Sequence, residues 1–373
     1  MNSAALAQSV ERRSRKAKVA GSIPAGGSEV NVNYRNVAST QLIMALVFYI
    51  LVIILFLVTY QQPKIKNYNS DFSSLDGIRG IASLWVAIFH TYSWQDNNLP
   101  ENFVLSHVIP LGTKAVPIFC ALSGFFIWKS LDAKLGANIN AKSLGKYYKK
   151  RLLRVYPLYI LTSIIIFTFS LIKPKPSGDE IIGNVLMTRI IGAETYWNPP
   201  TWSLYIEICF YVIAPIIYIF VHYFVSDSSK RRSLFYPGIL TLSWVVSSLI
   251  QSRESALVPY FVIGVIAFVY LDTKELQNSR LYSLLGMSFL IIDIVWYNLR
   301  LPKLFFDEPV PGFSYLLGIS CFFLIIGHNS NEQRILLGNL YMQWLGKISY
   351  SIYLLHPLLL AIWFSIRFDG RGG

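Results

Sequence analysis

The chain has 373 residues, of which 54% are hydrophobic and 15% aromatic, while only 14% are charged. An ordinary soluble domain is less apolar, and segments long enough to cross a bilayer of about 30 Å recur along almost the whole length. The net charge of +13 lies mostly in short loops beside these segments, where basic residues fix membrane orientation, so we do not expect nucleic-acid binding. The sequence predicts an all-α fold, a polytopic transmembrane helical bundle.

The N-terminal region differs from the rest of the chain. Residues 1–41 are polar and basic and lack helical or strand periodicity, which predicts a disordered tail. The apolar segment 43–60 is long enough for one span, and no small-residue cleavage site follows it, which favours a retained extra helix over a removed signal peptide. Further spans are predicted at about 75–93, 107–131, 152–172, 201–225, 234–251, 256–271, 281–298, 312–328 and 345–366, about ten in all.

The distribution of basic residues predicts the orientation. Lysine and arginine are densest between residues 129 and 154, so this loop is expected to be cytoplasmic. Alternation of the spans then places Arg79 near the cytoplasmic end of its helix and His90 towards the outer face. The same alternation puts the basic residues before position 43 outside, against the positive-inside rule. We therefore expect a native start at Met44, the alternative being a weakly oriented native tail.

The span at 75–93 carries the first candidate site residues. Arg79 and His90 are eleven residues apart, which in a helix is roughly 16 Å along one face, with Ser83 on the same stripe. Asp76 lies in the first turn, where the helix dipole favours a carboxylate. Ionisable side chains inside a span are costly and mark functional sites. His90 is a candidate general base, the alternative being a structural histidine bonded to a helix carbonyl.

A basic cluster at the cytoplasmic end of the 152–172 span is the second candidate. Lys150, Arg151 and Arg154, together with Arg79, would form a clamp for an anionic ligand, because a guanidinium matches phosphate at two points. The alternative is an ordinary stop signal that contacts lipid headgroups.

Glu207 and His356 are the remaining candidates for catalysis. Glu207 lies about one and a half turns into a span entered from outside, so we expect it at the depth of His90, with its carboxylate fixing the imidazole tautomer. The alternative is a structural ion pair with a lysine or arginine. His356 either lines the same cavity or bonds a helix carbonyl freed by Pro357. Ser123 is a possible nucleophile, although a small residue also serves helix packing.

Other chemistry finds little support in the sequence. The cysteines lie singly in apolar segments, which argues against a disulfide framework or a zinc site, and we expect no metal. No phosphate-binding glycine loop, paired-histidine zinc helix or nucleophile elbow occurs. The histidines at positions 107, 222 and 328 lie near span ends and are expected to face the membrane interface.

Taken in order, these motifs resemble acyltransferase family 3, the membrane O-acyltransferases of the O-antigen and exopolysaccharide acetylase type. The resemblance covers about residues 72 to 360, within an expected acyltransferase domain at 72–366. The matching motifs are Leu75-Asp76-Gly77-Ile78-Arg79-Gly80 with His90, Pro117-Ile118-Phe119 with Leu122-Ser123-Gly124-Phe125, Lys150-Arg151-Leu152-Leu153-Arg154, Trp202-Ser203-Leu204 with Glu207, and Ser349-Tyr350-Ser351-Ile352-Tyr353-Leu354-Leu355-His356.

The resemblance implies a bacterial inner-membrane enzyme. Such an enzyme takes an acyl group, often acetyl, from cytoplasmic acyl-CoA and places it on a hydroxyl of a cell-surface carbohydrate or lipid-linked glycan. The family's arginine–histidine pair maps to Arg79 and His90, and its basic element to Arg151 and Arg154. Trp202, Ser203 and Tyr350, which lie in the matching motifs, are further candidates for lining the site.

The chain departs from the family pattern in three places, and two other functions stay open. Glu207 stands alone where two adjacent acidic residues and a glutamine are common, the span 43–60 precedes the usual first helix, and the family's last span is expected to be missing.

The rival function is a transporter or flippase for an anionic or lipid-linked substrate. Such transporters are often built from inverted repeats, and no inverted repeat is visible in this sequence, which argues against that function. A non-catalytic partner in polysaccharide assembly is the third.

Overall fold

The computed structural model describes the larger part of the chain after residue 72. Every regular element in these ranges is a helix, so the all-α prediction is confirmed there. The predicted tail at 1–41 and the predicted span at 43–60 lie outside them, as does His107. The described residues are 73–94, 108–135, 139–170, 178–187, 198, 200–225, 229–250, 252–273, 278–299, 314–328 and 337–369.

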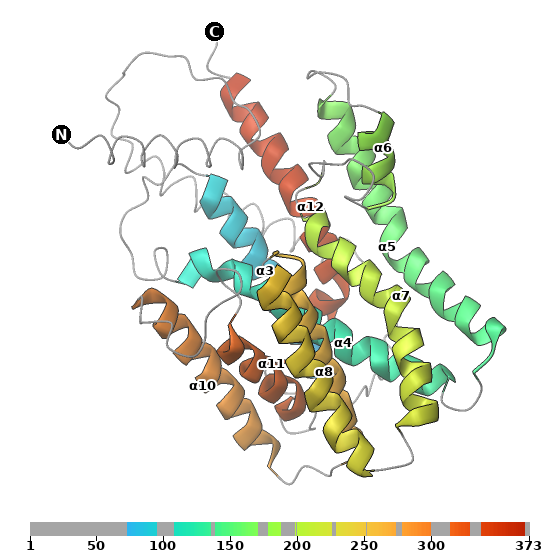
Figure 1. Cartoon of the computed structure of the whole chain (residues 1–373). Coiled ribbons are helices and arrows are strands. Elements are labelled where there is room, and N and C mark those ends of the chain that lie inside the picture. Colours follow the sequence, from blue (N-terminus) through green and yellow to red (C-terminus); the bar gives the residue numbers. More distant parts are fainter. Residues whose placement is uncertain are drawn as a thin grey trace, which may run out of the picture.

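The long helices form a bundle, and each span predicted from residue 75 onward falls on one of them (Figure 1). Among the described elements, α6 lies outside the predicted spans, while η2 and η3 are short 3₁₀ segments at the start of two of them. The bounds are α3 Ser73–Trp94, η2 Ile109–Lys114, α4 Ala115–Leu135, α5 Ala141–Ser170, α6 Gly178–Val185, α7 Thr201–Phe224, α8 Ser229–Ile250, η3 Ser255–Leu257, α9 Val258–Thr273, α10 Ser279–Asn298, α11 Tyr315–Gly327 and α12 Leu340–Asp369.

Several helices have the length and composition of membrane spans. Among the described residues, four segments qualify, namely Ile109–Leu135, Thr201–Phe224, Ser255–Asp272 and Ser279–Asn298. Two shorter apolar helices lie at Phe235–Ile250 and Tyr315–Gly327. The protein is therefore a membrane protein, while the total of ten spans stays a prediction.

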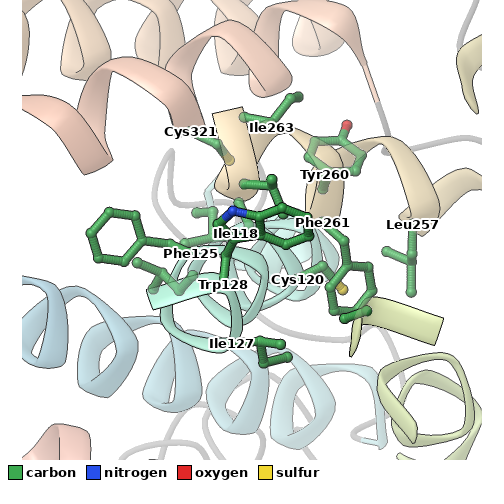
Figure 2. Close-up of a cluster of buried hydrophobic side chains, with 14 of the residues drawn as sticks. Ile118, Cys120, Phe125, Ile127, Trp128, Leu257, Tyr260, Phe261, Ile263 and Cys321 are labelled. Atoms are coloured by element: carbon green, nitrogen blue, oxygen red, sulfur yellow. The ribbon is translucent and has the colours of Figure 1, made fainter. Parts of the chain in front are cut away.

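Helix α4 is the centre of the bundle. In the most apolar stretch of Ile109–Leu135, which consists of η2 and α4, 78% of the residues are buried, against 17% in α10, so this segment is enclosed by protein and α10 presents most of its surface outward. Figure 2 shows Phe125 and Trp128 of α4 in the same buried cluster as Tyr260 and Phe261 of α9. Phe261 in turn stacks on Phe210 of α7, with ring centres 4.5 Å apart.

Helices α3 and α12 approach each other closely because glycines face the contact. A Cβ atom on Gly346 would lie 2.1 Å from the carbonyl oxygen of Asp76, and one on Gly77 would lie 2.1 Å from the carbonyl oxygen of Leu337, in the turn just before α12. No side chain fits at either position, so the two backbones touch. This contact fixes α12 relative to α3, the helix that carries Arg79 and His90.

Tyrosine hydroxyls attach α5 to its neighbours. Pro215 lacks an N–H group, so the carbonyl of Tyr211 has no partner within α7, and the hydroxyl of Tyr147 donates to that carbonyl over 3.2 Å. The hydroxyl of Tyr350 on α12 donates to the carbonyl of Val155 over 2.7 Å. These bonds place the basic face of α5 beside α7 and α12.

Candidate active site

A cavity of about 60 Å³ lies between α3, α4, α5, α7, α9 and α12. It combines two guanidinium groups, one carboxylate and several hydroxyls with an apolar wall that includes Phe119, Leu204 and Phe261. The helices that build it are far apart in sequence, so only the folded bundle assembles it. Its polar side chains are Arg79, Ser123, Arg154, Ser203, Glu207, Tyr211, Ser349, Tyr350 and Tyr353.

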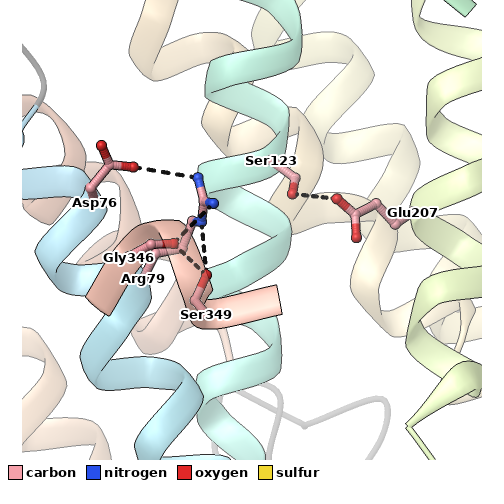
Figure 3. A network of polar contacts seen from close by, with 6 residues as sticks. All are labelled: Asp76, Arg79, Ser123, Glu207, Gly346 and Ser349. Carbon is pink, nitrogen blue, oxygen red and sulfur yellow. Dashed lines mark hydrogen bonds and ion pairs between the residues drawn. The ribbon is translucent and has the colours of Figure 1, made fainter. Parts of the chain in front are cut away.

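Arg79 is held from two helices. Its Nη1 lies 3.5 Å from Oδ1 of Asp76 on α3, while Nη2 donates to the carbonyl of Gly346 over 3.3 Å and Nε donates to Oγ of Ser349 over 3.4 Å (Figure 3). The guanidinium carbon also lies 5.9 Å from the centre of the Phe126 ring. Asp76 therefore acts on the cavity through Arg79. The result is a guanidinium of fixed direction that keeps its positive charge in the cavity.

The basic residues of α5 divide into two groups. Arg154 lines the cavity and is exposed, and within the described part of the chain it forms no ion pair or hydrogen bond. Arg151 does not line the cavity; its guanidinium lies 5.3 Å from the Tyr211 ring and 5.4 Å from the Tyr147 ring. Lys150 is exposed outside the cavity. The structure therefore brings Arg79 and Arg154 together, with Arg151 stacked behind the wall.

Glu207 faces the cavity from α7. Its Oε1 accepts a hydrogen bond from Oγ of Ser123 over 2.9 Å and one from the hydroxyl of Tyr211 over 2.5 Å. Figure 3 shows the Ser123 and Glu207 side chains pointing towards each other. The pairing that we predicted between Glu207 and the His90 imidazole is not formed, so Glu207 does not orient that base.

The physical reason is the depth at which α7 begins. Asn198, which precedes the helix, is 1% exposed, and its amide donates to the carbonyl of Leu354 on α12 over 3.2 Å. Thr201, the first residue of α7, is fully buried. Glu207 is six residues beyond Thr201, so α7 carries it past the level of Leu354 and into the same cavity as Arg79 and Arg154.

His90 instead pairs with His356. Nδ1 of His90 lies 3.2 Å from Nε2 of His356 and 3.0 Å from the carbonyl oxygen of Val86. Nδ1 of His356 lies 3.2 Å from the carbonyl oxygen of Ile352 in its own helix. The helix-carbonyl interpretation of His356 therefore holds in part, because Nδ1 bonds a carbonyl of its own helix while Nε2 faces the candidate base, and His356 does not line the cavity.

Tyr353 separates the histidine pair from the cavity. Its hydroxyl lines the cavity and lies 2.6 Å from Oγ of Ser203, while its ring centre is 6.0 Å from that of His356. Neither His90 nor His356 lines the cavity. The site therefore has two neighbouring parts, a cavity lined by both arginines and a histidine pair on the other side of the Tyr353 ring.

The other predicted lining residues differ in outcome. Ser203 and Tyr350 line the cavity, whereas Ser83 is buried and donates to the carbonyl of Gly80 in its own helix over 2.7 Å. Trp202 is partly buried against the hydrophobic core and does not line the cavity. His328 does not face the interface as predicted: it is 7% exposed and its Nδ1 donates to the carbonyl of Leu324 over 2.9 Å.

Several residues of the site were not predicted from the sequence. Tyr211 stands four positions after Glu207, a spacing that places both on one helix face and was a usable signal. Ser349 and Tyr353 stand in a matching motif but were not singled out, because their importance comes from contacts with other helices. The buried ion pair of Lys114 with Asp293, with 2.9 Å between Nζ and Oδ2, was also missed.

Comparison with known proteins agrees with the motifs. A protein of Acidianus two-tailed virus named an acetyltransferase is 26% identical over 315 residues, which cover 79% of this chain and 84% of the viral protein. Acyltransferase MdmB of Streptomyces mycarofaciens is 31% identical over 159 residues, or 39% of this chain and 38% of MdmB.

A third relative, from Staphylococcus aureus strain COL and named an O-acetyltransferase, is 22% identical over 336 residues. The match covers 80% of this chain and 52% of that protein, so the chain spans about half of its length. No solved structure is significantly similar to the chain. A sequence profile described as an acyltransferase domain matches residues 72–370. The chain therefore belongs to acyltransferase family 3.

Proposed function

We propose that the protein is an O-acyltransferase that moves an acyl group, which we expect to be acetyl, from acyl-CoA to a hydroxyl of a cell-surface carbohydrate or lipid-linked glycan. The observation that carries the proposal is the convergence of Arg79 and Arg154 on one cavity, next to the histidine pair. Membership of the family and the acetyltransferase names of two relatives support it. The proposed location is a bacterial cytoplasmic membrane, with the basic segment between 129 and 154, which joins the end of α4 to the first half of α5, on the inside.

The arginines are suited to the phosphates of the donor. Arg154 is exposed and its N–H donors are not engaged by any described residue, so an anion can approach it from outside the cavity. Arg79 is fixed further in by Asp76 and Ser349. Guanidinium groups bind phosphate oxygens through paired, charge-assisted hydrogen bonds, which matches the charge of acyl-CoA.

Glu207 is proposed to bind the acyl donor, acyl-CoA. Ser123 and Tyr211 both donate to Oε1, so within the described residues Oε2 is left to accept a hydrogen bond from a ligand. The pantetheine arm of acyl-CoA carries amide N–H groups that fit such an acceptor. We assign Glu207 to holding the donor in the cavity, in place of the orienting role that the sequence suggested.

His90 is the proposed base. The imidazole takes the proton from the acceptor hydroxyl as the hydroxyl oxygen attacks the thioester carbonyl. The new C–O bond forms, the C–S bond breaks, and the imidazolium returns the proton to the departing sulfur, which leaves as CoA thiol. The same base serves an acyl-enzyme route, in which the acceptor attacks an ester on the protein.

Transfer of label from [14C]acetyl-CoA to the surface glycans of the native cell tests the proposal in membrane vesicles. Arg154→Ala is expected to raise KM for acetyl-CoA roughly ten- to 100-fold, because this is the loss of affinity that corresponds to losing one charge-assisted hydrogen bond. His90→Ala is expected to lower kcat by roughly 10²- to 10⁴-fold. The matched control is Lys149→Ala, because Lys149 is an exposed cation on the same helix outside the cavity.

Three results would overturn the proposal. The first is a wild-type protein that transfers no label to any glycan fraction. The second is an equal rise in KM for Lys149→Ala, since Arg154 would then act only through the overall charge of α5. The third is full activity of His90→Ala. A transporter for an anionic lipid-linked substrate would bind at the arginines without consuming acetyl-CoA, so the first result also points to that function.

A further inference from the structure

The hydrogen bonds around His356 leave one assignment of its ring protons. Nδ1 lies 3.2 Å from the carbonyl oxygen of Ile352, and a carbonyl only accepts, so Nδ1 carries the hydrogen. In a neutral imidazole the other nitrogen then carries the lone pair. Nε2 of His356 is therefore an acceptor, and it is directed at His90.

The position of the ring hydrogen of His90 follows in the same way. Its Nδ1 faces two acceptors, the carbonyl oxygen of Val86 at 3.0 Å and Nε2 of His356 at 3.2 Å, so Nδ1 carries a hydrogen that both share. A doubly protonated His356 would turn an N–H towards His90 and force its lone pair against the Val86 carbonyl. With both rings neutral, the contacts are therefore satisfied when His90 carries its hydrogen on Nδ1 and its lone pair on Nε2.

This arrangement needs both helices at a fixed separation. His90 lies on α3 and His356 on α12, and the glycine contacts of Gly77 and Gly346 hold these backbones together. His356 is fully buried, and its ring also packs beside Tyr353. The pair is therefore prearranged, and its hydrogen bonds are in place before a substrate arrives.

We infer that His356 is the positioning residue for His90: it accepts the Nδ1 hydrogen and so keeps the Nε2 lone pair available for the acceptor hydroxyl. When His90 takes a proton on Nε2, the Nδ1–H bonds to Val86 and His356 remain, so the imidazolium forms without rearrangement. His356 performs the role that a carboxylate performs in a Ser–His–Asp triad, with Ile352 fixing its tautomer. The inference rests on the proposed function, because it names how that base is held.

Replacements of His356 that keep or remove the acceptor test the inference. His356→Gln retains an amide oxygen that accepts from His90, while His356→Leu has similar bulk and no acceptor. We expect His356→Leu to lower kcat roughly 100-fold, the low end of what a positioned base contributes, with KM for acetyl-CoA within about twofold of wild type. His356→Gln is expected to recover kcat to within about tenfold of wild type.

The matched control is His328→Leu. His328 is also a buried histidine whose Nδ1 bonds a carbonyl in its own helix, but it lies on α11 away from the cavity. This control is expected to keep the wild-type kcat, which would show that removing a buried histidine is not by itself enough to lower kcat. All kinetic values are divided by the amount of monodisperse protein after size exclusion.

The outcomes separate the two proposals. A wild-type enzyme without acetyl transfer refutes the proposed function. An active wild type with equal kcat for His356→Gln and His356→Leu refutes the positioning role alone, as does a change confined to KM. If His356→Leu does not assemble, His356→Phe takes its place; failure of both to assemble assigns His356 to folding and contradicts the inference.

Discussion

The ion pair of Lys114 and Asp293 offers a stability test that does not depend on the activity. Lys114 Nζ lies 2.9 Å from Oδ2 of Asp293, and the two side chains are 0% and 3% exposed. Asp293 also accepts a hydrogen bond from Ser314, the N-cap of α11, and the ammonium lies 5.0 Å from the Tyr297 ring centre. The pair therefore connects the start of α4 to α10 and α11.

The magnitude follows from the distance. At 2.9 Å and an effective dielectric constant of about 20, the attraction is about 6 kcal/mol, and desolvation of both ions offsets part of it. Lys114→Met leaves the Asp293 carboxylate buried without its cation, which we expect to cost about 3–5 kcal/mol. The double variant with Asp293→Asn removes both charges and keeps an amide oxygen for Ser314, so it should recover most of that loss.

The assay is unfolding in detergent micelles, followed by tryptophan fluorescence and by the amount of monodisperse protein after heating. The double variant is expected to be more stable than Lys114→Met alone, with a coupling energy of at least about 2 kcal/mol in the double-mutant cycle. Additive effects of the two single variants would refute the reasoning, because they would mean that the charges do not interact across the helices.

Two further predictions concern the cavity itself. Gly346→Ala places a Cβ 2.1 Å from the Asp76 carbonyl oxygen, so α12 must move away from α3 and from Arg79; we expect a loss of about 1–3 kcal/mol and a higher KM for acetyl-CoA. Gly145→Ala is the control, since nothing lies within 4 Å of that Cβ, and unchanged KM in both variants would contradict the account. Glu207→Leu leaves the hydroxyls of Ser123 and Tyr211 without their acceptor and should lower the free energy of unfolding, measured by chemical denaturation, by about 1–3 kcal/mol. Glu207→Gln keeps an acceptor and should stay near wild type. Equal losses of stability in the two variants would show that the charge of Glu207, and not its hydrogen bonds, stabilises the protein there.

The sequence by itself determined the helices and the basic side of the site. Apolar length is a local property, so each span predicted after residue 75 falls on a helix of the structure. Arg79 and Arg154 could be recognised because an ionisable side chain within a membrane span is energetically costly and therefore marks a functional site. Ser123 was open between nucleophile and packing residue, and the structure adds that its hydroxyl bonds Glu207.

The tertiary structure alone decided which partners these side chains have. His90 and His356 are 266 positions apart in the chain, so no spacing rule connects them, and only the α3–α12 contact brings their rings together. Glu207 was placed at the wrong depth because the burial of Asn198 lowers the start of α7 into the bundle. Helix periodicity fixes the face on which a residue lies, whereas its depth and its neighbours depend on how each helix is docked, which is set by contacts between distant segments.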